Sequence, residues 1–159
     1  MPKNTTIDQE RDLVLTRVVD VPREKLWRGW TEPALLTAWF APKPWTATDC
    51  EIDLQPGGIF RTVMQGPDGE GGDHTGCILE AVAPERIVFT DALQPGFRPS
   101  AESFFSAIVT FEEVPGGTRY TAVARHKNAE DCQKHRDMGF HEGWGLCLDQ
   151  LVAVAKSLD

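Results

Sequence analysis

The stretch AEDCQKHRDMGFHEGWGLCLDQLVAVAKSL, residues 129–158, decides the fold of this chain. Asn128 stands before it as a helix cap, and Glu130 and Asp131 lie in the first turn, where acidic side chains favour the helix dipole. Apolar residues then recur at spacings of three and four, which predicts one amphipathic helix roughly 45 Å long. The face predicted to be buried comprises Met138, His141, Trp144, Gly145, Leu148, Leu151, Val152 and Ala155.

Glycines interrupt the middle of this segment, at Gly139, Gly143 and Gly145. A glycine in a helix interior costs about 1 kcal/mol relative to alanine, so three of them in seven residues weaken the helix there. We therefore expect a kink at this point, or the close approach of another part of the chain.

The rest of the chain has the alternating apolar period of antiparallel strands. A first strand at 13–21 precedes two short helices at 23–30 and 32–40, with Pro22 in the first position of one and Thr31 as the cap of the other. Further strands are predicted at 45–54, 59–65, 75–82, 86–93, 103–114 and 118–126. This order predicts an α+β fold, in which a curved antiparallel sheet of about six or seven strands wraps around the long helix.

A single domain at residues 12–159 is expected to follow a flexible lead-in at residues 1–11. The lead-in lacks the apolar core of a signal peptide. A segment rich in proline and glycine at 94–102 is predicted to be a mobile lid.

Composition excludes several classes of function. The net charge of −8 argues against binding to nucleic acid or to an anionic membrane surface, because phosphate contacts need clustered Lys and Arg. No window approaches eighteen apolar residues, so no membrane span is expected. The four cysteines form no C-x-x-C pair, which predicts free buried thiols in a cytoplasmic protein.

Histidines are the first candidates for chemistry. His141 is placed on the buried helix face, four residues after Asp137, whose carboxylate could orient the ring for acid–base work or for hydrogen bonding to a ligand. The alternative is a structural histidine, and the same two hypotheses apply to His126. His135 and His141 lie six residues apart and face different ways, so neither a metal site nor a cofactor is expected.

Charged residues on strands could also face the space between sheet and helix. The candidates are Arg61, Glu80, Asp91 and Arg125, with Arg61 or Arg125 paired to Glu80 or Asp91. The alternative is that they lie on the solvated outer face of the sheet, because the pattern alone does not fix the strand register.

Aromatic residues are strongly skewed towards apolar rings, with five Trp and eight Phe against one Tyr. Small-molecule pockets are lined mainly by such side chains with a few polar groups. Some of these rings must simply pack the core. The predicted ligand-binding residues are Trp39, Phe60, Met64, Phe89, Phe105, His141 and Trp144.

Five stretches of the sequence resemble one known family. They are Pro22–Trp27, Trp39–Pro42, Asp53–Gly58, Ala83–Val88 and Gly139–Trp144, in an order and spacing that span nearly the whole domain. The chain resembles the Aha1-type family, named for the activator of Hsp90 ATPase, within the START-like superfamily, also called the SRPBCC or Bet v 1-like superfamily. The resemblance implies a helix-grip fold, and such folds serve co-chaperones, lipid carriers and polyketide cyclases.

Three functions follow as hypotheses. The first is binding of a small hydrophobic or amphipathic molecule between sheet and helix. The second is a cyclase-like or hydrolase-like enzyme at the same place, with His141, Asp91 and Arg61 as candidate catalytic residues. The third is a protein-interaction module, with a homodimer as one possible assembly and an Hsp90-type chaperone as the less favoured partner.

Overall fold

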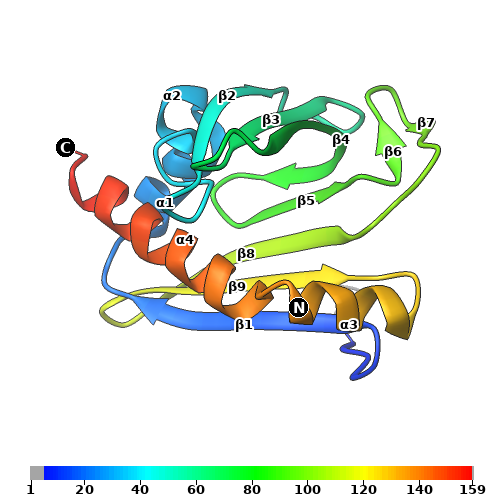
Figure 1. The fold of residues 1–159 in the computed structure, drawn as a ribbon. Helices are drawn as coiled ribbons and strands as arrows, with labels where there is room; N and C mark the ends of the chain where they lie inside the picture. Colours follow the sequence, from blue (N-terminus) through cyan, green and yellow to red (C-terminus); the bar gives the residue numbers. More distant parts are fainter. Residues whose placement is uncertain (1–5, 159) are drawn as a thin grey trace.

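The computed structural model describes residues 6–158 and contains one seven-stranded antiparallel sheet (Figure 1). Its strand order is β1-β9-β8-β5-β4-β3-β2. The strands are β1 Asp12–Val19, β2 Thr46–Ile52, β3 Ile59–Gln65, β4 Gly71–Val82, β5 Arg86–Thr90, β8 Ser106–Val114 and β9 Gly117–Arg125. The helices are α1 Arg23–Thr31, α2 Pro33–Leu36, α3 Ala129–Asp137 and α4 Phe140–Lys156. The α+β helix-grip architecture predicted from the sequence is confirmed.

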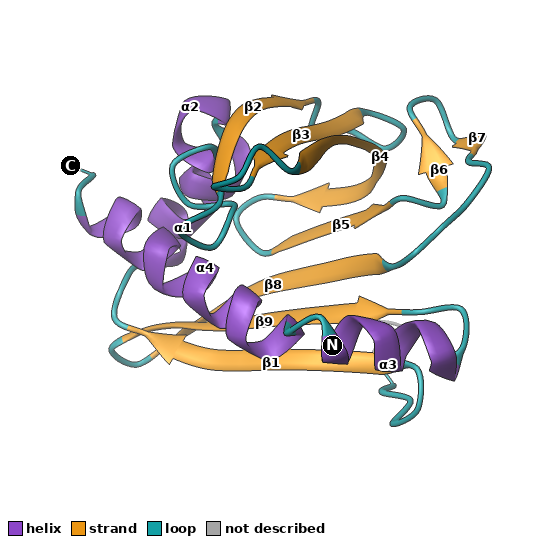
Figure 2. Cartoon of the chain, in the orientation of Figure 1, coloured by secondary structure: helices purple, strands orange, loops and turns teal. Residues whose placement is uncertain are grey.

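Helix α4 crosses the sheet from its β1 edge to α1 (Figure 2). The face of the sheet that it covers is called the inner face here. Alternate residues of β8 and β9 fill the core on that face, and those with fully buried side chains include Val109, Phe111 and Tyr120. Gly29 allows α1 to lie close to α4, because a Cβ added there would stand 2.5 Å from Cδ1 of Leu151.

The C-terminal segment forms two helices rather than the single helix that was predicted. Helix α3 ends at Asp137, and Gly139 adopts a left-handed conformation with φ of 92° before α4 begins. Such a backbone does not continue a right-handed helix, and glycine adopts it without steric cost. The predicted kink is therefore confirmed at Gly139, and the predicted cap is confirmed by the Asn128 side chain, which accepts a hydrogen bond from the backbone N–H of Asp131 at 2.7 Å.

The break at Gly139 also changes which residues face the core. Met138 is 67% exposed and His141 is exposed, so their predicted place on the buried face is wrong. Both lie next to the break, where a face extrapolated through a continuous helix no longer holds. The C-terminal part of the predicted face is correct, because Leu148, Leu151 and Ala155 are fully buried.

The early helices differ from prediction at their ends. Pro22 is the cap residue of α1 rather than its first helical residue. Thr31 closes α1, with its hydroxyl donating to the carbonyl of Trp27 at 2.8 Å, and Glu32 takes the predicted cap position of α2. Helix α2 is also shorter than predicted, and the chain after it is fixed by Gln150 of α4, whose amide donates to the carbonyls of Trp39 and Ala41.

The predicted lid segment 94–102 contains part of a small hairpin, β6 Leu93–Gln94 and β7 Arg98–Pro99. The side-chain amide of Gln94 donates to the carbonyl of Thr75, which fastens the hairpin to β4. At its tip Phe97 has a positive φ of 63°, and its ring lies over Gly57, where a Cβ would approach the ring to 2.8 Å. The mobility of this segment stays a prediction.

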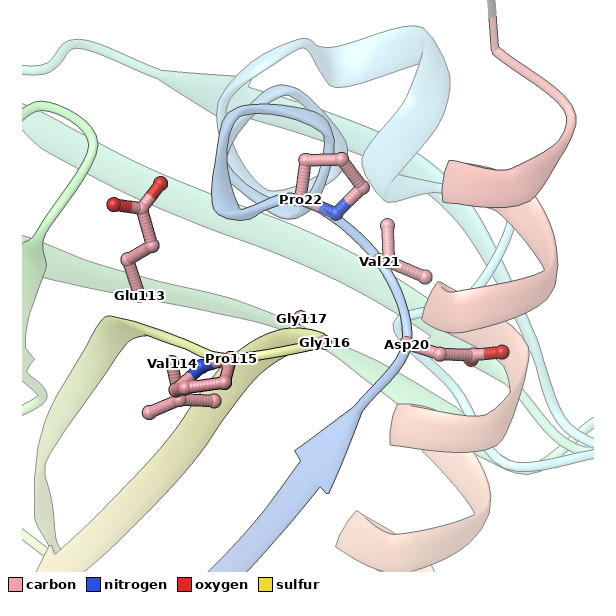
Figure 3. A pocket seen from close by; sticks show the side chains of 8 residues that line it. All are labelled: Asp20, Val21, Pro22, Glu113, Val114, Pro115, Gly116 and Gly117. Carbon is pink, nitrogen blue, oxygen red and sulfur yellow. The ribbon is translucent and has the colours of Figure 1, made fainter.

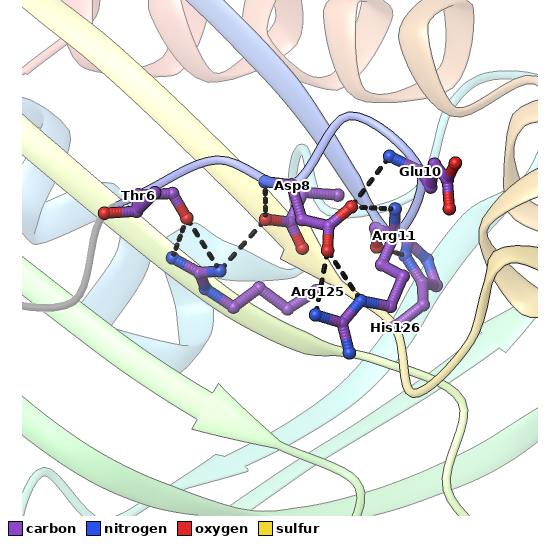
Figure 4. Close-up of polar contacts among 7 residues, drawn as sticks. Thr6, Asp8, Glu10, Arg11, Arg125 and His126 are labelled. Atoms are coloured by element: carbon purple, nitrogen blue, oxygen red, sulfur yellow. Dashed lines mark hydrogen bonds and ion pairs between the residues drawn. The ribbon is translucent and has the colours of Figure 1, made fainter.

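Residues 6–11 of the predicted lead-in make hydrogen bonds with the sheet (Figure 4). The backbone N–H of Asp8 donates to the Asp12 carboxylate at 2.8 Å, and the Arg125 guanidinium donates to the carbonyl of Thr6. Residues 1–5 lie outside the described part, so the flexibility of the lead-in stays a prediction. Between residues 6 and 158, no helix is both long enough and apolar enough to cross a bilayer.

Candidate functional site

Two groups of aromatic residues on the inner face include side chains that the sequence predicted to bind a ligand. The first, called the tryptophan cluster, contains Trp30, Trp39, Phe40, Phe60 and Phe89. The second, called the histidine cluster, contains Phe104, Phe105, His126, His135, Phe140 and Trp144. The two groups come from different parts of the sheet. Phe60 and Phe89 lie within β3 and β5, whereas Phe105 directly precedes β8 and His126 directly follows β9.

The tryptophan cluster is tightly packed. Trp30 is 1% exposed, and its ring centroid lies 5.1 Å from that of Trp39 and 5.9 Å from that of Phe89. Phe60 and Phe89 approach to 4.5 Å between centroids. Three predicted ligand-binding residues, Trp39, Phe60 and Phe89, therefore contact other rings of the core, and a ligand would reach them only by displacing those rings.

The histidine cluster is more open. Phe105 and Trp144, both predicted ligand-binding residues, are half-buried and lie 6.1 Å apart in an edge-to-face arrangement. Phe104 is also half-buried, whereas Phe140 is buried against Trp144. Two of the predicted residues thus lie together at a place where aromatic surface remains accessible.

The cluster takes its name from two buried histidines. Nε2 of His126 lies 2.8 Å from Nδ1 of His135. On the other side of the same ring, Nδ1 of His126 lies 2.8 Å from the carbonyl oxygen of Arg11, and Figure 4 shows these two residues. The rings of Phe104 and Phe105 each stand 4.9 Å from the His135 ring. Burial, followed by the neighbouring His126, lowers the pKa of His135 to about 4, so this ring is neutral at pH 7.

Asp91 borders the same region at the end of β5. Both of its carboxylate oxygens lie 2.9 Å from the backbone N–H of Phe104, and the backbone N–H of Asp91 points to the carbonyl of Phe105. Burial raises the pKa of this carboxyl despite those hydrogen bonds. The side chain therefore fixes the strand end that carries Phe104 and Phe105.

The other predicted binding residues lie apart from this pair. Met64 is half-buried on β3. His141 is exposed on α4, where its Nε2 lies 3.2 Å from the carbonyl oxygen of Val14 on the edge strand β1. That contact matches a structural role for the ring, which was the alternative hypothesis.

Arg61 lies on the outer face of the sheet, which was the alternative to a pairing with Glu80 or Asp91 across the inner face. Arg61 binds Asp49 and Asp73 at 3.0 and 2.9 Å, on the face of the sheet away from α4. The remaining charges pair in the same manner, Arg86 with Glu80 and Arg125 with Asp12. Arg61 contacts Asp49 and Asp73, Asp91 contacts the Phe104 N–H and His141 contacts the Val14 carbonyl, so the three side chains have separate partners rather than forming one acid–base group.

The thiols of two cysteines are poor nucleophiles. Burial raises the pKa of the Cys50 thiol to about 11 and that of Cys147 to about 12, so neither is a ready nucleophile at neutral pH. Across residues 6–158, no three side chains of His, Cys, Asp or Glu gather in a way that could hold a metal ion.

Two surface hollows are lined by none of the residues of the aromatic clusters. One of about 530 Å³ lies where β1 ends beside the β8–β9 turn, and its lining includes Asp20, Pro22 and Glu113 (Figure 3). The other, of about 560 Å³, lies along α3 beside Lys134 and Met138. Neither is lined by a residue that the sequence predicted to bind a ligand.

The contact between His126 and His135 was missed at the level of sequence. The residues are nine positions apart, one directly after a strand and one within the following helix, so no single periodicity relates them. The one signal in the sequence was the cap residue Asn128, which lies between the two histidines and marks where β9 gives way to α3. The last turn of α3 then lies beside the end of β9.

Comparison with known proteins agrees with this architecture. Residues 20–156 match the family described as activator of Hsp90 ATPase homolog 1-like protein. The chain belongs to this family. Among curated proteins no match was found.

Solved structures of similar proteins come from several bacteria. Protein NE0264 from Nitrosomonas europaea is 45% identical, with a TM-score of 0.92 over 95% of this chain and 97% of that one. Protein Ms6760 from Mycobacterium smegmatis is 31% identical, with a TM-score of 0.77 over 91% and 90%. An AHSA1-like protein from Aeromonas hydrophila shares the fold at 23% identity, with a TM-score of 0.69 over 92% of each chain. Membership in the activator of Hsp90 ATPase homolog 1-like family thus rests on both sequence and fold.

Proposed function

We propose that the protein binds a small apolar or amphipathic molecule on the inner face of the sheet, against Phe105 and Trp144. The observation that carries this proposal is that both rings face the core side of the molecule yet remain half-buried. Covering them removes apolar surface from water, which is worth roughly 25 cal/mol per Å². Aromatic and lipid-like compounds are the chemical classes that gain most from such burial.

Polar groups at the border of the cluster favour an amphipathic ligand. The Asp91 carboxylate accepts from backbone N–H groups, including that of Phe104, and its two oxygens offer about four acceptor positions in all, so it could receive a hydroxyl or amine of the ligand. The tryptophan cluster supports the site from the side, because its closely packed rings hold β3 and β5 in place.

Titration with 1-anilinonaphthalene-8-sulfonate, an amphipathic aromatic probe, tests the proposal. We expect saturable probe fluorescence for the natural chain and at least a tenfold weaker affinity for Trp144→Ala, since about 1.4 kcal/mol of lost contact gives that factor. Trp45→Ala is the matched control, because Trp45 is also half-buried but lies in the loop before β2. Equal affinities of the two variants would refute the proposed site. Native mass spectrometry of gently purified protein would then identify any natural ligand.

A second candidate function is protein interaction through the outer face of the sheet. Val14, Val123, Ile108 and Val88 stand in register across β1, β9, β8 and β5 and form an apolar stripe, in which Val123 and Ile108 are buried and Val14 and Val88 half-buried. Val18, four residues after Val14 on β1, is 55% exposed. An Hsp90-type chaperone is one partner to test, given the family. Val88→Lys should abolish stimulation of the chaperone ATPase if the stripe is the contact, while Val82→Lys, at an exposed valine off the stripe, should not.

A further inference from the structure

The two histidines join three separate parts of the chain. His126 follows the last residue of β9, His135 lies in the final turn of α3, and the Arg11 carbonyl belongs to the segment that precedes β1. Both rings are almost fully buried, at 6% and 7% exposure. The pair therefore holds α3 against the end of the sheet beside Phe105.

The carbonyl of Arg11 fixes the direction of these hydrogen bonds. A carbonyl only accepts, so Nδ1 of His126 carries a proton and donates to it. The Nε2 of a neutral His126 then accepts, and Nδ1 of His135 donates. The pair can take up one proton without losing this hydrogen bond. In that state His126 carries hydrogens on both nitrogens, and His135 carries its hydrogen on Nε2, so that its Nδ1 accepts from Nε2 of His126. With two added protons, both facing nitrogens carry hydrogens at 2.8 Å, and the hydrogen bond is lost.

The surroundings oppose protonation. Phe104, Phe105 and Phe140 pack around the His135 ring, and Nζ of Lys134 lies over the Phe104 ring at 5.9 Å. The nearby carboxylates already have partners, which are Arg125 for Asp12, Lys127 for Asp131, Arg11 for Asp8 and the Phe104 N–H for Asp91. Helix α4 contributes the exposed His141, whose ring packs on Phe140, and Glu142 in its first turn.

We propose that His126 and His135 form an acid-sensitive latch, which holds α3 on the sheet at neutral pH and releases it when both rings are protonated. Helix α3 has nine residues, too few for an isolated helix to persist in water, so it depends on this packing. Its release would remove one wall of the histidine cluster and expose Phe105. The latch does not depend on whether the cluster binds a ligand.

Amide hydrogen exchange followed by mass spectrometry tests the latch. After correction for intrinsic exchange rates, we expect protection of Ala129–Asp137 to fall at least tenfold between pH about 7 and about 4, while β8 and β9 stay protected. His135→Asn should retain α3 protection over the same range, because its amide can replace Nδ1 as the donor but does not titrate. His74→Asn, the same change at an exposed histidine, should behave as the natural chain does.

Two outcomes would overturn the latch. One is α3 protection in the natural chain that does not change with pH, and the other is the same pH dependence in His135→Asn. If that variant does not fold, nitrogen NMR of the imidazole rings in the natural chain provides an independent test. We expect Nδ1–H tautomers for both histidines at neutral pH, whereas an Nε2–H tautomer of His135 at neutral pH would refute the arrangement.

Discussion

The tryptophan cluster and the histidine cluster lie on the same face of one sheet but have different physical properties. The first consists of apolar rings in mutual contact, and the N–H of Trp30 is satisfied by the buried Tyr120 hydroxyl at 3.1 Å. The second combines half-buried rings with two histidines and the Asp91 carboxyl. We infer that the first cluster maintains the fold under all conditions, whereas the second can respond to a ligand or to protons.

Trp30→Ala should cause the largest loss of stability and tests whether the tryptophan cluster maintains the fold. Trp30 contacts four other aromatic rings and is fully buried, so we expect a loss of about 3–5 kcal/mol in unfolding free energy, measured by urea denaturation. Leu146→Ala, at an exposed position of α4, is the control and should change stability by less than about 0.5 kcal/mol. A loss below about 1 kcal/mol for Trp30→Ala would mean that this cluster does not carry the core.

Substitutions at the helix junction should have intermediate effects of opposite sign. Gly139→Ala forces alanine into a left-handed backbone and should destabilise by roughly 1–2 kcal/mol. Gly143→Ala, four residues on, meets no atom within 4 Å and should stabilise by up to about 1 kcal/mol through helix propensity. Thermal unfolding of the two variants gives the comparison. If both variants changed the unfolding temperature in the same direction, Gly139 would not be the residue that needs the left-handed backbone between α3 and α4.

Asp91→Asn should change stability least. It separates the pH dependence that Asp91 gives to the stability of the chain from the opposite dependence that His135 gives. Folding raises the pKa of Asp91, so this carboxyl binds a proton at a pH where the same group in the unfolded chain does not. Its contribution to the free energy of unfolding therefore increases as pH falls. His135 has the opposite sign, because its lowered pKa means that stability is lost as pH falls from about 6.5 towards 4.

We therefore expect the stability of Asp91→Asn relative to the natural chain to decrease between pH 7 and pH 4, by about the amount that the titration of this one carboxyl supplies. The asparagine oxygen can still accept from the Phe104 N–H, so the loop should remain in place. Denaturation curves at several pH values measure the difference. A difference in unfolding free energy that stays the same at every pH would contradict the raised pKa of Asp91.

Local patterns predicted most of the fold. Alternation identified the strands of the large sheet, and the Asn128 cap located the start of α3, because both signals depend on neighbouring residues only. The single C-terminal helix was wrong for a reason that the sequence contained, since Gly139 adopts the backbone angles that only glycine adopts freely.

The candidate site was harder to predict because it depends on register. Arg61 belongs to the outer face by strict alternation with Phe60, but which face was inner became clear only with the helices in place. The aromatic residues were identified as a set, yet their division into a closed and a half-open cluster follows from packing between β3, β5, α3 and α4. The histidine pair needed the relative positions of β9 and α3, which no local pattern contains.

The ring of Phe97 on Gly57 has a consequence for sequence variation. The ring occupies the volume that any side chain at position 57 would need, and it is held there by a backbone conformation that bulky residues rarely adopt. Gly57 itself has a left-handed φ of 85°, so a side chain at 57 is disfavoured both by the ring and by the backbone. In an alignment of relatives, position 57 in the β2–β3 turn should therefore remain glycine whichever residue stands at position 97 in the β6–β7 hairpin.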